Sequence, residues 1–466
     1  MSGILHGAMS QEEKYQMMTE TPIPKLIGRL AVPTIISMLV TSFYNMADTF
    51  FVGKIDTSAT AAVGIVFPVM AMIQALGFFC GHGSGNSISR KLGSKDIKAA
   101  EELAATGFFC AMILGVVIML LGLGFLRPLS LALGSTETIL PYTRDYLGII
   151  LIGAPYMTAQ MVLNNQMRYQ GNAFFSMIGV TAGAVLNIAL DPLFIFVFDM
   201  GISGAAIATV LSQLVSFALL LAGIRLSNCI PIRIRNIKFS SLRLREIVGG
   251  GLPSLFRQGL SSLATITLNV AANPFGDAAI AAMSVVSRIT MFAGSAVIGF
   301  GQGFQPVCGF NYGAKKFERV RESFWFCVKL STVFLIAASV LGAVFSSRLI
   351  GVFRADADVV DIGSLALRFQ CLTFPLIGWI TLNNMMMQTT GKTFYATILA
   401  ASRQGVFFIP ALLILPHFFG LVGIQAAQAA ADACAFAITM VIYFLAMKHM
   451  DEEMNSHEAV SRLTGR

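Results

Sequence analysis

Long apolar runs recur along the whole chain and are separated by short polar stretches. A helix that crosses a bilayer needs about 20 mostly apolar residues, and these runs reach that length. Because they are continuous rather than alternating with a period of two, they predict membrane-spanning helices rather than the strands of a barrel. Twelve spans are predicted, near residues 26–52, 59–85, 104–126, 142–161, 175–198, 203–225, 248–272, 279–304, 323–346, 362–387, 395–416 and 421–447.

The last six spans repeat the pattern of the first six. Sliding the chain against itself by 220 residues aligns residues 31–102 with 251–322 without a gap, and Gly93 then meets Gly313. An even number of spans in each repeat leaves both repeats in the same orientation, related by an axis along the membrane normal. The pattern therefore predicts an all-α protein with two six-helix bundles. A transporter commonly has this architecture, and a scaffold or a channel subunit is the plainer alternative.

Composition agrees with a polytopic membrane protein. Of the 466 residues, 56% are hydrophobic and 12% are charged, whereas soluble domains carry about 25% charged residues. The same values exclude a disordered chain. The 7 cysteines are scattered singly, which excludes a disulfide framework and a Cys-x-x-Cys metal site. Residues 1–24 contain no apolar core and predict no signal peptide, while the amphipathic stretch 11–30 predicts a short helix at the membrane surface.

The basic residues predict the orientation. With an internal amino terminus, 22 Lys and Arg residues fall in inside segments, Arg168 among them, and 5 fall in outside segments. Basic residues are enriched on the cytoplasmic side, so both termini are predicted to be cytoplasmic and the protein is predicted to span the cell membrane. This distribution also accounts for the net charge of +8 without a nucleic-acid partner. The lipid bilayer is the expected surrounding.

These observations predict a division of the chain into five parts. They are a cytoplasmic N-terminal segment (1–24), an N-lobe (25–225), a basic cytoplasmic linker (226–247), a C-lobe (248–447) and a cytoplasmic tail (448–466).

Only three acidic residues lie well inside predicted spans: Asp48, Asp191 and Asp432. A carboxylate in the bilayer costs several kcal/mol unless it is paired, hydrated or protonated, so each is a functional candidate. Asn187 and Asp191 are four residues apart and share a helix face. Pro192 frees a backbone carbonyl and predicts a kink beside them. The alternative is that such an acid caps a broken helix or satisfies a neighbouring side chain.

The repeat gives these acids an asymmetric distribution. Asp48 aligns with Leu268 and Asp191 aligns near Pro410, so neither acid recurs in the second half. Any ion coupling through these acids would therefore reside in the N-lobe.

The second half carries intramembrane arginines instead, namely Arg257, Arg288 and Arg403. Arg403 and Asp432 lie at similar depth on consecutive spans. We interpret them as a buried ion pair that fixes helix packing, in preference to a direct substrate contact. Methionines such as Met161 suit an adaptable cavity for flat apolar ligands.

Two short motifs resemble those of enzymes, but neither indicates an enzyme here. Gly391-Lys392-Thr393 resembles the end of a P-loop, but Met386 stands where that motif requires glycine. Residues 201–204 (GISG) resemble the short motif around the nucleophile of an intramembrane serine protease. We interpret them as the start of a helix with Ser203 as a cap. No enzymatic activity is predicted.

Taken together, several motifs resemble the multidrug and toxic compound extrusion (MATE) family. They are residues 48–53 (DTFFVG), 187–192 (NIALDP), 201–209 (GISGAAIAT), 301–306 (GQGFQP) and 311–316 (NYGAKK). The resemblance implies a V-shaped protein with two six-helix lobes around a central cavity. It also implies export of lipophilic organic cations in exchange for protons or sodium ions.

The resemblance also implies which residues carry coupling. Carried over, they are Asp48, Asn187 and Asp191, with Thr209, Asn164 and Tyr44 as polar neighbours. One branch of the family places acids in helices 7 and 10 of the second lobe. Here those helices have no interior acid, so the chain resembles the branch with first-lobe acids.

From this reading we expect a monomeric secondary antiporter that works by alternating access and has no cofactor. The coupling ion, a proton or sodium, is expected at Asp48, Asn187, Asp191 and Thr209, since hard cations take oxygen ligands. The predicted substrate-cavity residues are Tyr44, Asn164, Met161, Arg257, Gln258, Arg288 and Arg403. The rival hypothesis is a flippase for anionic lipid-linked precursors, which the C-lobe arginines would suit. A channel or structural role is third.

Overall fold

The computed structural model describes residues 9–55, 57–354 and 356–464, and within them the chain is helical with no β-strand. After α1 (Gln11–Glu20) the first bundle contains α2 (Ile23–Val52), α3 (Thr57–Gly93), α4 (Ile97–Gly124), α5 (Leu126–Ala132), α6 (Leu140–Tyr169), α7 (Ala173–Pro192), the π-helix η1 (Leu193–Val197) and α8 (Gly201–Leu226). The linker contains η2 (Ile234–Asn236), and the second bundle contains α9 (Ser241–Ala272), η3 (Asn273–Phe275), α10 (Asp277–Gly313), α11 (Phe317–Val344), α12 (Ser346–Phe353), α13 (Ala357–Thr389), α14 (Thr393–Ala401), the π-helix η4 (Ser402–Phe408), α15 (Ile409–Phe419) and α16 (Leu421–Thr464).

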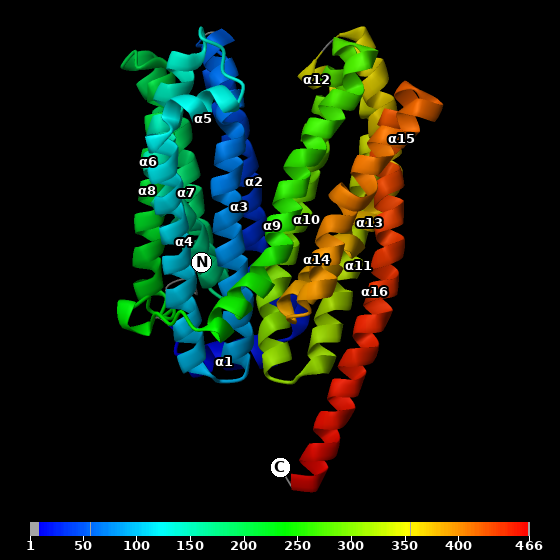
Figure 1. The fold of residues 1–466 in the computed structure, drawn as a ribbon. Helices are drawn as coiled ribbons and strands as arrows, with labels where there is room; N and C mark the ends of the chain where they lie inside the picture. The colour runs from blue at the N-terminus through cyan, green and yellow to red at the C-terminus, as the bar shows by residue number, and fades with distance from the viewer. Residues whose placement is uncertain (1–8, 56, 355, 465–466) are drawn as a thin grey trace.

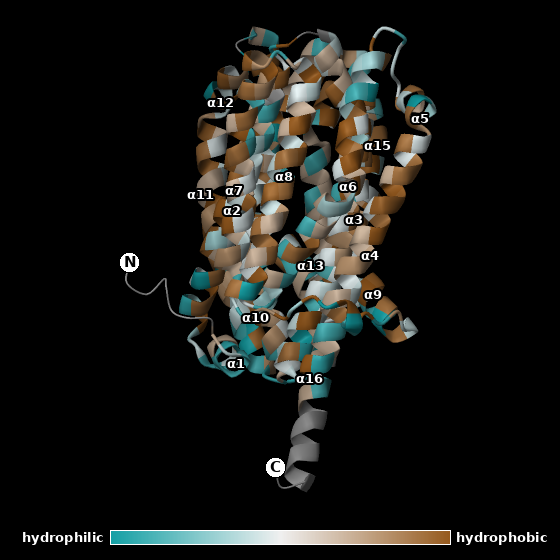
Figure 2. Cartoon of the chain, turned by 90° about the vertical axis from the view of Figure 1, so that its left-hand side faces the viewer, coloured by the Kyte–Doolittle hydropathy of each residue, from teal (hydrophilic) through white to brown (hydrophobic). Residues whose placement is uncertain are grey.

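The predicted all-α membrane fold is confirmed. Among the described residues, 11 helices are long and apolar enough to cross a membrane. The remaining predicted span, 248–272, lies in α9, which is 32 residues long but carries several charged residues, including Arg257. Large apolar side chains such as Leu120 and Leu372 stay exposed on the outside of the bundles. Apolar residues dominate the outer faces of the helices in Figure 2, and polar residues gather near α1.

The two bundles approach each other near α1 and diverge toward the end that carries α5 and α12 (Figure 1). Their junction uses glycines at repeat-equivalent positions. A methyl group added at Gly83 of α3 would collide with the carbonyl oxygen of Ile247 on α9, and one added at Gly303 of α10 would lie 2.5 Å from Cα of Ala31 on α2. Only residues without a side chain allow helices to approach this closely. The junction is thus pseudo-symmetric, as the repeat requires.

Of the stretch 11–30 that predicted a short helix, residues 11–20 form α1, which packs against both bundles, and the remainder leads into α2 at Ile23. Lys14 is 2% exposed, and its Nζ donates to the carbonyl oxygens of Ser227 and Asn228 after α8, at 2.9 and 2.6 Å. On the other side, Asn311 of α10 donates to the carbonyl oxygen of Met18 at 3.0 Å. The helix therefore links the two bundles at their narrow end.

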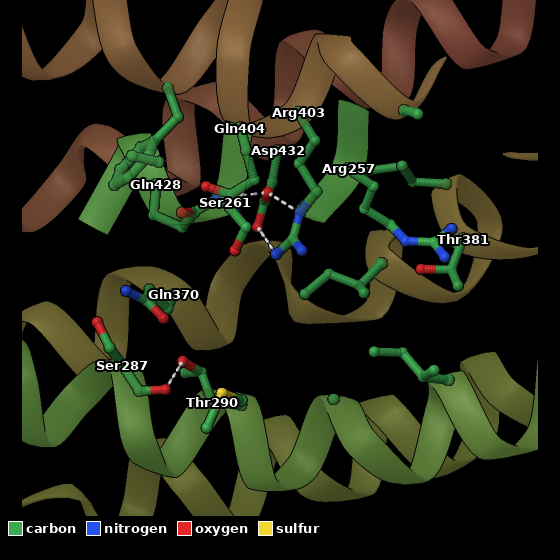
Figure 3. A pocket seen from close by; sticks show the side chains of 18 of the residues that line it. Arg257, Ser261, Ser287, Thr290, Gln370, Thr381, Arg403, Gln404, Gln428 and Asp432 are labelled. Carbon is green, nitrogen blue, oxygen red and sulfur yellow. Dashed lines mark hydrogen bonds and ion pairs between the residues drawn. The ribbon is translucent and has the colours of Figure 1, made fainter. Parts of the chain in front are cut away.

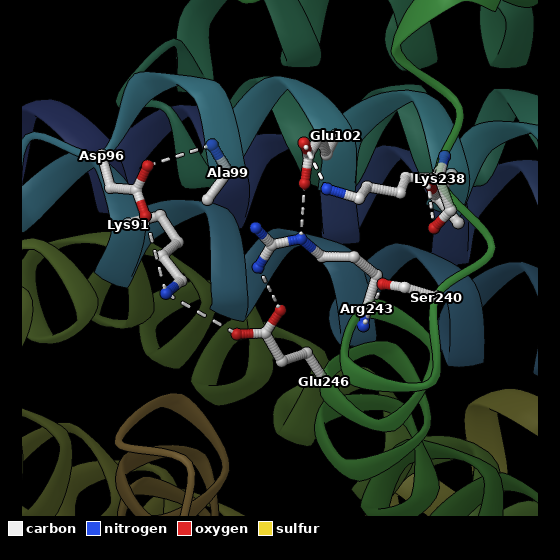
Figure 4. Close-up of polar contacts among 9 residues, drawn as sticks. Lys91, Asp96, Ala99, Glu102, Lys238, Ser240, Arg243 and Glu246 are labelled. Carbon is white, nitrogen blue, oxygen red and sulfur yellow. Dashed lines mark hydrogen bonds and ion pairs between the residues drawn. The ribbon is translucent and has the colours of Figure 1, made fainter.

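The basic linker is fixed to the first bundle by ion pairs (Figure 4). Glu102 of α4 pairs with Lys238 at 3.2 Å and with Arg243 at 2.9 Å, and Arg243 also pairs with Glu246 at 2.8 Å. The last part of the predicted linker is already helical, because α9 begins at Ser241 and Ser240 caps it. The predicted tail continues α16 as far as Thr464, and residues 465–466 lie outside the described residues.

Pro192 changes the type of helix. The α-helix α7 runs through Pro192 and widens into the π-helix η1. In the equivalent span of the second bundle, α14 also widens into a π-helix, η4, although η4 begins earlier in its span than η1 does. A π-helical turn inside a span often accompanies a functional site, and here Asp191 precedes the first and Arg403 lies in the second.

Candidate functional site

A polar cluster around Asp191 lies inside the N-lobe. Asp191 and Asn187 of α7 are 0% and 1% exposed, and Thr209 of α8 is 1% exposed. The Asn187 amide, oriented to satisfy both of its ends, donates to Asp191 Oδ2 at 3.0 Å and accepts from the Thr209 backbone N–H at 3.2 Å. Asn187 therefore anchors the carboxylate of Asp191 to α8.

Asp48 of α2 belongs to the same cluster. Its carboxylate interacts electrostatically with that of Asp191, and the Tyr44 hydroxyl interacts electrostatically with both. Asp48 Oδ1 is buried and has no hydrogen-bond partner within the described part of the chain. The structure thus brings together Tyr44, Asp48, Asn187, Asp191 and Thr209. Sequence analysis missed Tyr146 of α6, which interacts with the same acids.

The cluster lacks a positive partner. Within the described residues, neither Asp48 nor Asp191 forms an ion pair with a Lys, Arg or His side chain. Burying two ionised carboxylates without compensation costs several kcal/mol for each. The described residues also contain no group of three His, Cys, Asp or Glu side chains suited to a metal ion. Two carboxylates with amide and hydroxyl oxygens nearby fit a proton or a small monovalent cation.

Two predicted substrate-cavity residues have other contacts. Asn164 of α6 donates to Ser176 Oγ of α7 at 2.8 Å, and Met161 packs so closely on α3 that a methyl group added at Gly77 would lie 2.8 Å from its sulfur. Both side chains thus lie where α6 meets its neighbours. Their role toward a substrate stays a prediction.

The C-lobe contains a cavity of about 420 Å³ (Figure 3). Arg257, Gln258 and Arg403 line it, together with Asp432. Arg288 is exposed and does not line this cavity, so its role toward a substrate stays a prediction.

The ion pair predicted from Arg403 and Asp432 is present in this cavity. Arg403 Nε donates to Asp432 Oδ1 at 2.7 Å, and Gln428 Nε2 donates to the same oxygen at 2.8 Å. Asp432 is 1% exposed. Its charge is therefore fully compensated by groups on η4 and α16.

A buried polar cluster between the bundles was not predicted. Arg168, assigned from the sequence to a cytoplasmic loop, is 2% exposed on α6 and donates to Gln302 Oε1 of α10. His82 of α3 and Gln388 of α13 both bond to Ser254 Oγ of α9, at 2.7 and 2.8 Å. The repeat offered one sequence signal for this cluster. Arg168 and Gln388 are 220 residues apart, so the two polar side chains occupy equivalent positions in the two bundles.

Comparisons with known proteins agree with this architecture. The MatE family matches residues 33–193 and 253–414. Multidrug export protein MepA of Staphylococcus aureus strain MSSA476 is 27% identical over 438 residues, which cover 93% of this chain and 97% of MepA. The crystal structure of MATE in complex with MaL6 has a TM-score of 0.89 and 26% identity, and the match covers 94% of this chain and 99% of that one. A multidrug resistance MATE family transporter of the MOP superfamily in an outward-facing conformation has a TM-score of 0.88 and 26% identity, with 94% and 98% covered.

Proposed function

The chain belongs to the MatE family and is a multidrug efflux transporter, and from that premise we propose that it exports lipophilic organic cations in exchange for protons or sodium ions. Members of this family are transporters rather than enzymes, in agreement with the sequence prediction. Similarity to multidrug export proteins does not favour the flippase alternative.

The observation that carries the coupling proposal is the unpaired cluster in the N-lobe. Asp191 has an amide partner but no cationic one, and Asp48 has a buried oxygen without a partner in the described residues. Two neighbouring carboxylates in a medium of low dielectric constant repel each other, so a bound proton or cation is strongly favoured. The site is therefore suited to hold an ion during one half of the cycle and release it in the other.

The bundle arrangement supports alternating access. The lobes meet near α1 and diverge at the opposite end (Figure 1). With both termini in the cytoplasm of the cell, as the basic residues predict, this arrangement is open to the outside. An ion then reaches Asp48 and Asp191 from the outside, and the substrate leaves in the same direction.

Ion binding and substrate binding oppose each other in this scheme. A proton or sodium ion neutralises the N-lobe cluster and weakens its attraction for a cationic substrate, which is then released. The π-helix that follows Asp191 widens the helix beside the cluster, and repacking of α2 or α7 would transmit the charge change to the lobe interface. Loss of the ion to the cytoplasm restores the negative charge and the affinity for the next cation.

We further propose that one chain forms the complete substrate path. The residues assigned to it are Tyr44, Asn164, Met161, Arg257, Gln258, Arg288 and Arg403, which lie in both lobes. No second copy is needed to complete the ion site, because Tyr44, Asp48, Asn187 and Thr209 come from α2, α7 and α8 of one bundle.

Purified protein in liposomes tests the proposal. Vesicles preloaded with the cationic dye rhodamine 123 are given either a pH gradient in sodium-free buffer or a sodium gradient with the pH gradient collapsed. We expect one of the two gradients to drive dye export above protein-free vesicles. If neither gradient moves the dye, cation antiport is the wrong function.

A further inference from the structure

The two lobes differ in the charge of their polar interiors. The N-lobe cluster contains two carboxylates and no cation, whereas the C-lobe cavity is lined by two guanidinium groups, Arg257 and Arg403, and one carboxylate, Asp432. Since Arg403 and Asp432 neutralise each other at 2.7 Å, the charge that remains in the C-lobe cavity is that of Arg257.

Arg257 has only neutral partners among the described residues. Its Nη1 donates to Asn384 Oδ1 at 3.2 Å and its Nη2 to Ser254 Oγ at 3.5 Å. A guanidinium group has five N–H donors, so most of its donors are unused. In Figure 3 the guanidinium group of Arg257 lies beside Thr381, apart from the ion pair of Arg403 and Asp432. It is therefore available to a ligand in the cavity.

The surroundings of Arg257 increase the positive potential. Arg168 of the N-lobe interacts electrostatically with it across the junction of the bundles. Arg168 itself donates to the neutral side chains of Gln302 and Asn165, and neither arginine forms an ion pair with a carboxylate within the described chain. One buried and one half-buried cation without a counter-ion favour an anion.

We propose that the C-lobe cavity binds the carboxylate group of an aromatic, amphiphilic molecule on Arg257. This inference rests on the proposed export function and deepens it, because it assigns to Arg257 the selection of substrates that carry a carboxylate. Arginine holds a carboxylate through two parallel hydrogen bonds. Gln258, which lines the cavity beside it, supplies a further donor.

The rest of the cavity suits the aromatic part of such a molecule. Met283, Met385, Phe374 and Phe408 line it, and thioether groups adapt to flat rings. A volume of about 420 Å³ lies in the range of about 300–1,000 Å³ that is typical of small-molecule sites.

The test uses two dyes that differ only at the carboxylate. Rhodamine 110 has a free carboxylate, and rhodamine 123 is its methyl ester. Binding of each dye to the detergent-purified full chain is measured by fluorescence polarisation without any ion gradient. The variants are Arg257→Met and Arg257→Gln, and the matched control is Arg245→Met, because Arg245 is exposed on the same helix.

We expect both Arg257 variants to bind rhodamine 110 at least about tenfold more weakly, which is the effect of losing about 1.4 kcal/mol. The affinity for rhodamine 123 should fall less, and Arg245→Met should change the affinity for neither dye. Equal losses for both dyes would overturn the inference, as would unchanged binding of rhodamine 110. The variant Asp48→Asn distinguishes the two sites. If Asp48→Asn weakens the binding of rhodamine 110 and the Arg257 variants do not, the dye binds in the N-lobe and the inference is wrong. Failure of gradient-driven export would overturn the antiport function but would leave this carboxylate-dependent binding intact.

Discussion

Gly93 of α3 and Gly313 of α10 make reciprocal contacts across the junction of the two lobes. A methyl group added at Gly93 would collide with the carbonyl oxygen of Phe310, and one added at Gly313 would collide with the carbonyl oxygen of Arg90. The two contacts are related by the internal repeat. They close the narrow end of the protein by direct approach of two helix backbones.

Substitution of Gly93 should open this end. A valine there collides with the backbone of α10, and overpacking of this kind costs about 1–3 kcal/mol. If that cost falls only on the closed state, the population of open states rises by about 5- to 150-fold. Cys308 of α10 is 0% exposed, so its labelling by N-ethylmaleimide, quantified by mass spectrometry against the exposed Cys434, measures the opening.

The same helix offers a control for this experiment. A methyl group added at Gly64 of α3 meets no atom within 4 Å, so Gly64→Val adds the same side chain without a collision. Labelling of Cys308 that is no faster in Gly93→Val than in Gly64→Val would show that the glycine contact does not hold the lobes closed.

Lys14→Glu should detach α1. The lysine donates to two carbonyl oxygens, those of Ser227 and Asn228, and a carboxylate would meet the same oxygens with repulsion. A loss of about 1–3 kcal/mol is expected for unsatisfied groups of this kind. Cys229 is 6% exposed beside Lys14, so faster maleimide labelling of Cys229 would report the detachment. Lys25→Glu, an exposed site on α2, should leave the labelling unchanged.

Much of the fold could be predicted from the apolar runs and the repeat. Runs of this length permit few structures in a bilayer, and a constant offset of 220 residues fixes the equivalence of the lobes. The contacts of α1 could not be predicted, because they depend on the distance between the end of α8 and the end of α10 in space. Arg168 was assigned to a loop, because counting charges along the chain does not reveal that the last turn of α6 is buried.

The ion pair in the C-lobe should respond differently to single and double substitution. Arg403→Met leaves Asp432 buried without its cation, and breaking a buried pair in this way costs about 3–5 kcal/mol. Arg403→Met combined with Asp432→Leu should recover most of that loss, because an apolar replacement of a whole buried pair is often neutral. Titration with SDS in mixed micelles gives the unfolding free energies of the single and the double variant, and hence the loss and its recovery. A single variant as stable as the unmodified protein, or a double variant less stable than the single one, would contradict a structural pair.

The candidate sites were predicted to different extents. Intramembrane acids are rare enough that Asp48 and Asp191 stand out in the sequence, and the spacing of Asn187 and Asp191 places them on one helix face. Tyr146 lies on α6, far from both acids in the chain, so only the packing of three helices brings it to the cluster. The cavity beside Arg257 depends on the volume left between helices, which no sequence pattern reports.

Asp48→Asn and Asp191→Asn should uncouple transport from the ion. Each change keeps the size of the side chain but removes one site for a proton or cation. Uphill export should fall at least about tenfold, equivalent to about 1.4 kcal/mol, while downhill exchange of dye across the membrane continues. Asp199→Asn is the matched control, because Asp199 is exposed and has a positive φ of 51°, which asparagine tolerates.

The most direct measurement compares these variants in liposomes that carry the gradient found to drive the unmodified protein. Rhodamine 123 export against its concentration gradient and gradient-free dye exchange are recorded on the same preparation. We predict that Asp48→Asn and Asp191→Asn lose uphill export and keep exchange, whereas Asp199→Asn keeps both. Uphill export by both N-lobe variants at the rate of the unmodified protein would contradict coupling through these carboxylates.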